Sequence, residues 1–288
     1  MTIPHAKRVR SPGAMVAALR ADPHAPYAAM IEVADRCNEA CIHCYQVHGS
    51  RREMSTEQIE QVMDQLAALG VLFLTISGGE PTLRPDFLQL VEHARSLRFA
   101  VKIFSNGLRI DAEMARALSE LAVQSVELSL YSHRPEVHDR ITRVPGSFER
   151  TVSAARWLIA EGVHVVLKAP LMKPNASDYE AYIDWVEALG ADYVLDPHLD
   201  PREDGSLEPT ALRVDDRSYV RLRSDARLVE PSEPTPAPRA PELERSVCGA
   251  CSGFVHVEAD GELRPCTQLQ IPVGHALREG IQKAHESN

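Results

Sequence analysis

The sequence lacks any hydrophobic run long enough to cross a membrane, and it has no excess of positive charge. Its most apolar stretch, VLFLTI at residues 71–76, is far shorter than a membrane span. The basic start is followed by GAMVAAL, but this stretch runs straight into Arg20 and Asp22, which excludes a secretory signal. Lysine and arginine number 31 against 41 aspartate and glutamate residues, for a net charge of −10. We therefore expect a cytoplasmic protein that binds neither nucleic acid nor membrane.

The sequence is also poor in cysteine, and its 6 cysteines fall into two groups of equal size. Cys37, Cys41 and Cys44, here called the loop cysteines, lie within RCNEACIHCY at residues 36–45, with no fourth cysteine nearby. A disulfide cannot use three thiols, and a structural zinc site normally needs a fourth protein ligand close by. In a reducing compartment, clustered cysteines more often bind metal or carry out redox chemistry than form disulfides.

What the sequence does contain is a regular alternation of short β-rich runs with segments of helical periodicity. This alternation, repeated along the chain, predicts an α/β fold with a parallel sheet that helices cover on the outside. Such a sheet can close into a barrel or stay open, and in both cases ligands bind in the loops after the strands. The expected strands are residues 28–34, 71–76, 100–104, 125–130, 163–169 and 192–196, and the expected helices are residues 55–70, 85–97, 111–121, 147–162 and 177–190.

The alternation stops after Asp196, and the rest of the chain has a different composition. Residues 230–242 are dense in proline, which is typical of a linker. We expect a hairpin around the turn at residues 259–261 and a helix near residues 275–286. No separate peptide-recognition domain is expected before the sheet. We divide the chain into an N-terminal extension (1–27), a sheet domain (28–200), a connecting segment (201–246) and a small C-terminal region (247–288).

The loop cysteines have the spacing C-x3-C-x2-C and follow the first expected strand. Thiolates at such close spacing can converge on one small iron-sulfur cluster. If three cysteines hold a four-iron cluster, one iron keeps a vacant position where chemistry can take place. The alternatives are a structural zinc site or cysteines that lie together by chance.

On these residues the chain resembles the radical S-adenosylmethionine (SAM) superfamily. The shared features are the cysteine spacing, its place after the first strand, the strand order and the next loop, over residues 28–200. The resemblance implies a partial (β/α)6 barrel similar to a TIM barrel, followed by a small hairpin and helix extension. It also implies that the loop cysteines hold a [4Fe-4S] cluster whose open iron binds SAM. Reductive cleavage of SAM would then yield a 5′-deoxyadenosyl radical that abstracts hydrogen from a substrate.

Gly78, Gly79 and Glu80 follow the second expected strand. Two glycines let the backbone approach a ligand closely, and a carboxylate can hold a cation. On its own, a glycine pair shortly before Pro81 is most simply a turn that starts a helix. The resemblance implies that this segment holds the amino group of SAM.

Three polar residues end two further strands. Ser105 and Asn106 end the third expected strand, and Ser129 ends the fourth. A capped turn explains such serines about as well as contact with a ligand does. The resemblance implies that Ser129 bonds the ribose of SAM and that the other two face the same rim.

Residues 138–150, HDRITRVPGSFER, are similar to a segment that places a carboxylate-binding arginine in related maturases. Judged by the spacing from Ser129, either Arg140 or Arg143 could be this carboxylate-binding arginine, and we favour Arg143. The resemblance also places His43, just before the third loop cysteine, near the adenine of SAM. The catalytic acid or base is not identified by the sequence.

Cys248, Cys251 and Cys266 form the second group, with the spacing C-x2-C-x14-C. Two close cysteines with a third across a hairpin make a metal half-cage, for which zinc is the structural alternative. The group resembles the SPASM or shorter twitch extension of radical SAM enzymes, which holds auxiliary iron-sulfur clusters. Because no cysteine follows Cys266, we expect one auxiliary cluster, whose fourth ligand is water, substrate, His256 or His275.

The resemblance favours an oxidoreductase-like maturase that acts on a ribosomally made peptide or on a protein residue. Reduced flavodoxin or ferredoxin would supply the electron, and a separate protein could bind a leader peptide. Acidic residues at 195–209 are available to bind substrate or accept a proton, although many would simply be solvated. Two other functions stay open: radical rearrangement of a small molecule in cofactor biosynthesis, and a non-catalytic iron-sulfur scaffold.

Overall fold

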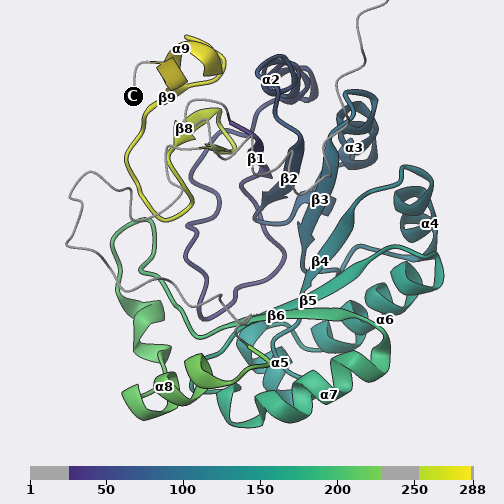
Figure 1. Cartoon of the computed structure of the whole chain (residues 1–288), viewed down its shortest axis with the longest axis vertical. Helices are drawn as coiled ribbons and strands as arrows, with labels where there is room; N and C mark the ends of the chain where they lie inside the picture. The colour runs from purple at the N-terminus through teal and green to yellow at the C-terminus, as the bar shows by residue number, and fades with distance from the viewer. Residues whose placement is uncertain (1–25, 229–252, 287–288) are drawn as a thin grey trace, which may run out of the picture.

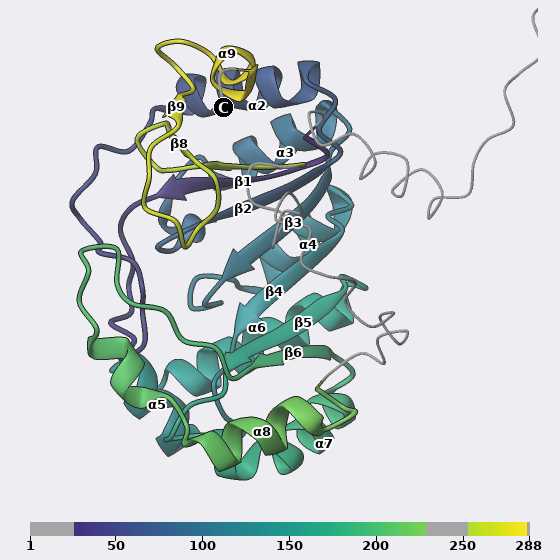
Figure 2. The same ribbon diagram turned by 60° about the vertical axis from the view of Figure 1, so that its left-hand side comes forward.

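Six parallel strands, β1 to β6, form the centre of the fold (Figure 1). The structure is a computed structural model, and it describes residues 26–228 and 253–286. Each of these strands pairs with the next one along the chain, and the sheet curves so that one face is concave (Figure 2). This arrangement confirms the predicted α/β fold with a partial TIM-like barrel. The strands are β1 (Ala28–Ala34), β2 (Phe73–Gly78), β3 (Ala100–Ser105), β4 (Ser125–Ser129), β5 (Val165–Pro170) and β6 (Asp192–Asp196).

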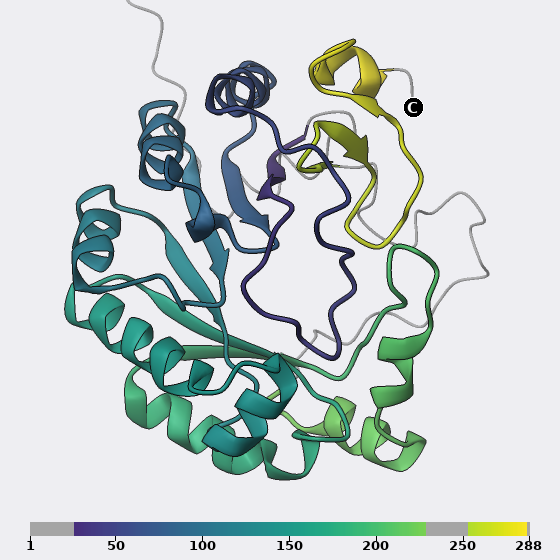
Figure 3. The same ribbon diagram turned by 180° about the vertical axis from the view of Figure 1, so that it is seen from behind.

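Helices cover the convex face of the sheet, as Figure 3 shows from behind. The five helices expected between the strands are present, whereas the helix expected near residues 275–286 covers only Ile281–Glu286. Helix α2 begins with a capping box between Ser55 and Gln58. Two further helices, α5 and α8, were not expected, because each is mostly polar. The helices are α2 (Thr56–Ala68), α3 (Phe87–Ser96), α4 (Ala112–Glu120), α5 (Pro135–Thr142), α6 (Ser147–Ala160), α7 (Tyr179–Leu189) and α8 (Asp216–Ser224).

The two faces of the sheet differ because successive side chains of a strand point to opposite sides. In β1, Ile31 and Val33 are fully buried in the hydrophobic core that the helices cover. Glu32, between them, belongs to the other face, where it meets Gln46 and His256 rather than apolar side chains. Burial of the aliphatic face therefore holds the helices on, and the concave face is left for polar groups.

The C-terminal residues continue the same sheet beyond β1. Strand β7 (Phe254–Val257) runs parallel to β1, and β8 (Glu262–Arg264) returns antiparallel to β7, which forms the hairpin predicted around residues 259–261. The two-residue strand β9 (Gly274–His275) pairs with β8, and the short helix α9 (Ile281–Glu286) packs near α2. The division of the chain at residues 201 and 247 stays a prediction. In the part of the chain that the structure describes, no helix could cross a bilayer.

Candidate active site

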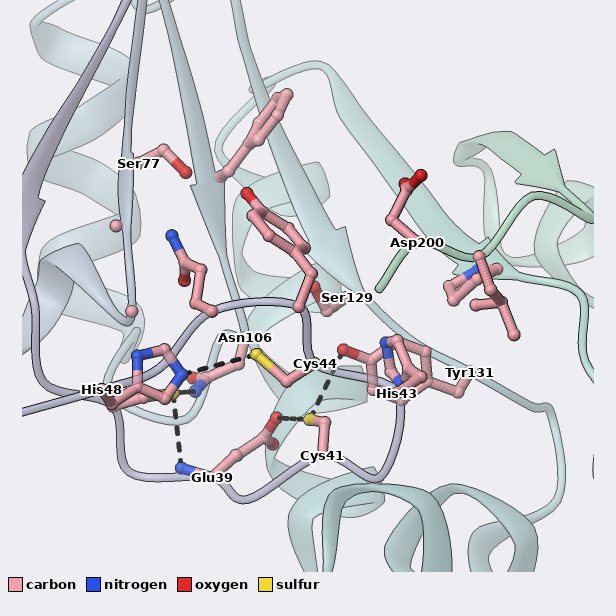
Figure 4. A pocket seen from close by; sticks show the side chains of 18 of the residues that line it. Glu39, Cys41, His43, Cys44, His48, Ser77, Asn106, Ser129, Tyr131 and Asp200 are labelled. Atoms are coloured by element: carbon pink, nitrogen blue, oxygen red, sulfur yellow. Dashed lines mark hydrogen bonds between the residues drawn. The ribbon is translucent and has the colours of Figure 1, made fainter. Parts of the chain in front are cut away.

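The segment after β1, residues 35–53, is here called the cysteine loop, and it crosses the concave side of the sheet (Figure 3). Beneath it lies a cavity of about 330 Å³, shown in Figure 4. The walls come from the cysteine loop, the carboxyl ends of β2 to β5 and the segment after β6. The cavity brings together these residues that the sequence singled out: Cys37, Cys41, His43, Cys44, Gly78, Gly79, Ser105, Asn106 and Ser129.

The three loop cysteines are free, half-buried thiols. The Cys41 thiol lies 3.3 Å from Glu39 Oε2 and 3.6 Å from the Tyr131 hydroxyl, and Cys44 Sγ lies 3.5 Å from His48 Nε2. Burial raises the pKa of the Cys37 thiol to about 12, and it raises the pKa values of Cys41 and Cys44 as well. Thiols in this setting keep their protons at neutral pH unless a bound cation replaces them.

The arrangement of the thiols fits an iron-sulfur cluster better than a zinc ion. Among the described residues, no three histidine, cysteine, aspartate or glutamate side chains could together hold a single metal ion. The loop cysteines instead line one cavity. The loop cysteines could hold an iron-sulfur cluster in this cavity, because each iron of such a cluster needs only one cysteine from the protein.

Gly78 and Gly79, here called the glycine pair, lie against the backbone of the cysteine loop. The amide of Gly79 donates to Ala34 O at 2.8 Å, and a Cβ built on Gly79 would lie 2.4 Å from Arg36 O. At Gly78, with a φ of +131°, a Cβ would lie 2.3 Å from Ala34 O. The glycine pair therefore lets the first residues of the cysteine loop pack directly on the end of β2.

Glu80 does not line the cavity, because its side chain is completely buried behind it. Its carboxylate accepts hydrogen bonds from Ser105 Oγ at 2.8 Å, from the Asn106 amide at 2.7 Å and from the Thr82 amide at 3.1 Å. Burial raises the pKa of Glu80, against the opposing effect of these bonds. Glu80 thus organises the ends of β2 and β3, whose residues do line the cavity.

The other predicted residues differ in where they lie. His43 packs edge-on against Tyr131, with 4.6 Å between ring centroids, and burial lowers its pKa to about 4, so the ring is neutral at pH 7. Ser129 lines the cavity at the end of β4. Arg143 does not line it: this exposed residue follows α5 with a left-handed φ of 61°.

Several residues that line the cavity were missed by the sequence analysis. Tyr131 lies in the loop after β4, and its aromatic type on a polar rim was a usable signal. His198, which follows β6, was also missed, and it bonds to Asp200 at 3.0 Å; Asp200 itself belongs to the acidic stretch at residues 195–209 that the sequence analysis singled out. Gln268 comes from the connection between β8 and β9, and no local pattern indicates that this segment reaches the cavity.

The second cysteine group is described only in part. Cys248 and Cys251 lie outside the described residues, and Cys266 is a free, half-buried thiol between β8 and β9. Of the two candidate fourth ligands, His256 is buried with its Nε2 3.2 Å from Glu32 Oε1. His275 Nδ1 accepts a hydrogen bond from the Leu277 amide at 3.2 Å.

Comparison with known proteins finds similar chains of several activities. The chain is 34% identical over 170 residues to the PqqA peptide cyclase of Ruegeria pomeroyi, covering 58% of this chain and 46% of that protein. It is 35% identical over 170 residues to the mycofactocin maturase MftC of Mycobacterium tuberculosis, covering 58% and 43%. It is 35% identical over 155 residues to the Fe-coproporphyrin III synthase of Methanosarcina barkeri, covering 53% and 39%. The chain therefore spans less than half the length of these relatives.

Among solved structures, Streptococcus suis SuiB bound to the precursor peptide SuiA superimposes with a TM-score of 0.70 at 16% identity. The match covers 99% of this chain and 72% of that one. At this identity the likeness shows the fold alone. A family profile described as the radical SAM superfamily matches residues 31–186, which is more than half of the 288 residues. The match includes the loop cysteines and the strands β2 to β5, and the protein therefore belongs to the radical SAM superfamily.

Proposed function

We propose that this protein is an enzyme that cleaves SAM reductively and abstracts hydrogen from a residue of a peptide or protein, in a maturation reaction such as crosslinking or oxidation. The observation that carries the proposal is the cavity, where the loop cysteines, the glycine pair and the strand-end residues Ser105, Asn106 and Ser129 meet. Its volume of about 330 Å³ falls within the usual range for small-molecule sites.

The residues of this chain would bind and orient the reacting groups. The loop cysteines would hold a [4Fe-4S] cluster and lose their protons to solvent as iron binds. When bound, the cluster and SAM together supply a radical that abstracts hydrogen. Asn106 Nδ2 donates to Asn38 Oδ1 at 2.7 Å, which ties the end of β3 to the cysteine loop beside Cys37. The neutral His43 ring and the buried Tyr131 would keep water from the part of the cavity beside Cys41.

A peptide substrate is supported by the names of similar proteins. One relative is named a PqqA peptide cyclase, and the SuiB structure holds a precursor peptide. These substrates belong to those proteins, and their extension to this chain is part of the proposal.

The central test is SAM cleavage by the full chain. The protein would be reconstituted anaerobically with iron and sulfide, reduced with dithionite and assayed for 5′-deoxyadenosine. We expect product from the wild type and none from the Cys37/Cys41/Cys44 triple alanine variant. Product at the wild-type rate from that variant, or none from a wild type that carries iron, would refute the proposed function.

We further propose that Cys248, Cys251 and Cys266 hold one auxiliary cluster. The support is that Cys266 lies on the same connection as Gln268, which lines the cavity. Iron counting tests this: about eight irons per chain should fall to about four when the three residues are replaced by alanine. SAM cleavage should persist in that variant, and unchanged iron content would contradict the second cluster.

Reduced flavodoxin or ferredoxin is the proposed electron donor. Either protein, reduced enzymatically, should replace dithionite in the assay.

Leader-peptide recognition by a separate protein also stays a proposal. A small open reading frame beside the gene would point to the peptide.

The similarity to an Fe-coproporphyrin III synthase supports a second candidate, radical chemistry on a small molecule. The two candidates differ in where the abstracted hydrogen comes from. A deuterated peptide that transfers deuterium to 5′-deoxyadenosine supports the first candidate, whereas transfer only from a deuterated small molecule supports the second.

A further inference from the structure

Two lysines meet on the concave face of the sheet, directly beneath the cavity. Lys102 Nζ lies 2.8 Å from Glu127 Oε1, and Lys168 Nζ lies 3.0 Å from Glu127 Oε2. The three residues come from β3, β4 and β5, which are neighbours in the sheet. Lysine is rare in this chain, so this pairing stands out: the lysines are Lys7, Lys102, Lys168, Lys173 and Lys283.

On each of the three strands, the member of this group comes just before a residue that lines the cavity. Phe104, Ser129 and Pro170 line the cavity, and each lies two positions after a member of the group on the same strand. Residues two apart in a strand share a face. Strand pairing also sets Lys168 directly beside Ser129.

The Lys168 ammonium itself lies against a residue of the cavity. Its Nζ is 3.7 Å from the centroid of the Phe104 ring, a cation–π contact. About one third of the Lys168 side chain is still exposed, at 33%. An ammonium that is partly desolvated in this way favours an anion within reach.

The charges of the group do not balance. Glu127 is buried, but Lys168 and Lys102 outweigh the effect of burial and lower its pKa, so the carboxylate is ionised. One carboxylate then faces two ammonium groups. Among the described residues, no other carboxylate forms an ion pair with either lysine.

The acidic side chains nearby are engaged elsewhere. On β6, Asp192 pairs with His164, and Asp196 accepts from the His198 amide. On β1, Glu32 is bonded to Gln46 and His256. Within the group of Lys102, Glu127 and Lys168 itself, one positive charge is therefore left over beside the cavity.

We propose that Lys168, supported by Lys102, forms a carboxylate-binding subsite next to the cavity, beside Phe104 and Ser129, and that it takes an acidic group of the peptide substrate. This inference rests on the proposed function and narrows it to peptides that present a carboxylate, from Asp, Glu or the C-terminus, next to the reacting residue. Such a group would neutralise the excess charge through a charge-assisted hydrogen bond.

The small number of lysines makes a direct test practical. The reconstituted full chain would be labelled with [15Nζ]lysine, and the NMR signals of Lys102, Lys168 and Lys173 would be assigned from single variants. The probes are N-acetylglutamate amide, with one carboxylate, and N-acetylglutamine amide, with the same shape and no charge. We expect the first probe to shift the Lys102 and Lys168 signals saturably, the second to leave them unchanged, and Lys173 to respond to neither.

Variants of Lys168 and Lys173 then separate an effect of charge on probe binding from an effect on folding. Lys168→Gln should weaken binding of the charged probe roughly tenfold or more, because the carboxylate of the probe loses its charged donor. The variant should still fold, since Glu127 keeps Lys102 as its partner. Lys168→Arg should retain binding. Lys173→Gln, which makes the same charge change at an exposed residue, should bind like the wild type. Equal binding of both probes, or wild-type binding by Lys168→Gln, would overturn the subsite.

The same spectra distinguish the source of the carboxylate. If SAM alone saturates the shifts of both lysines and excludes the charged probe, the subsite belongs to the SAM carboxylate and the substrate assignment is overturned. Formation of 5′-deoxyadenosine is measured in parallel. A wild type that cleaves SAM but shows no saturable shift refutes the subsite alone, whereas one that carries iron but cannot cleave SAM refutes the proposed function and the substrate assignment with it.

Discussion

At the scale of single residues, the glycine pair shows how a backbone contact builds a site. The amides of Gly79 and Glu80 donate to Ala34 O and Arg36 O, so the cysteine loop begins as a close neighbour of β2. A side chain added at either glycine would meet backbone atoms first, and these cannot rotate away. The position of Cys37 therefore depends on the absence of a side chain at residue 79.

We expect Gly79→Ala to destabilise the protein by about 2–3 kcal/mol, because the added methyl group overpacks against Arg36. The iron content of this variant after reconstitution should also fall. Gly162→Ala is the matched control: its Cβ would meet open space, so only the strain of a left-handed φ of +76° is added, about 1 kcal/mol. Urea unfolding and iron counting check both variants, and full iron content in Gly79→Ala would contradict the prediction.

At the scale of elements, Arg51 joins three segments that are distant in the sequence. Its guanidinium lies 2.8 Å from Glu203 Oε2, after β6, and 2.9 Å from Glu258 Oε2, after β7, while its own amide donates to Asp35. Both glutamates are buried, so each needs a cation nearby. Arg264, 2.9 Å from Glu258, is the second cation of this network.

Arg51→Met should therefore cost about 3–5 kcal/mol of unfolding free energy, since it leaves Glu203 and Glu258 short of a buried partner. Arg52→Met, at the exposed neighbouring position, should change stability by about 0.5 kcal/mol or less. Chemical denaturation of the two variants side by side measures the difference. Equal stability would show that the network does not hold these segments together.

Glu258 should also make stability depend on pH. Burial and the nearby Glu32 raise its pKa to about 7, against the opposing effects of His256, Arg51 and Arg264. Between the unfolded pKa of 4.5 and about 7, the folded state holds a proton that the unfolded state has released. This contribution to stability is therefore present at low pH and is lost as the pH rises through 7.

We expect the wild type to lose about 1–3 kcal/mol from this group between pH 5 and pH 8, and Glu258→Gln to lose less over the same range. Thermal or urea unfolding at several pH values compares the two slopes. A variant slope as steep as that of the wild type would assign the effect to another group, such as Glu39, whose pKa burial also raises to about 7.

At the scale of the whole molecule, the C-terminal strands complete the sheet. Strand β7 pairs along β1, and Met54 donates to Ala259 O at 2.8 Å, so the cysteine loop is enclosed from that side. The connection after β8 also brings Gln268 to the cavity. The cavity is therefore a property of both ends of the described chain.

A variant truncated after residue 228 should bind iron poorly. Its β1 would become an edge strand with unpaired backbone groups, which promotes aggregation. Glu32 and Arg51 would also lose their partners His256 and Glu258. Size-exclusion chromatography and iron counting test this, and a monomer with the full loop-cysteine cluster would refute it.

The sequence by itself determined the order of the six parallel strands, the five helices that alternate with them and the rim that carries the loop cysteines. It did so because aliphatic periodicity encodes which face of each element is buried, and cysteine spacing encodes which thiols can share a cluster. Helices α5 and α8 escaped notice because their sequences are polar on average, with few apolar residues to mark a buried face.

Only the tertiary structure decided where the polar residues of the site lie. Glu80 is buried behind the cavity, Arg143 lies outside it, and Gln268 enters it from the C-terminal strands. The pairing of β7 with β1 joins residues more than 200 positions apart, as between Met30 and His256. Local pattern cannot specify such contacts, because they depend on how the curved sheet brings distant segments together and on where each long polar side chain then finds a partner.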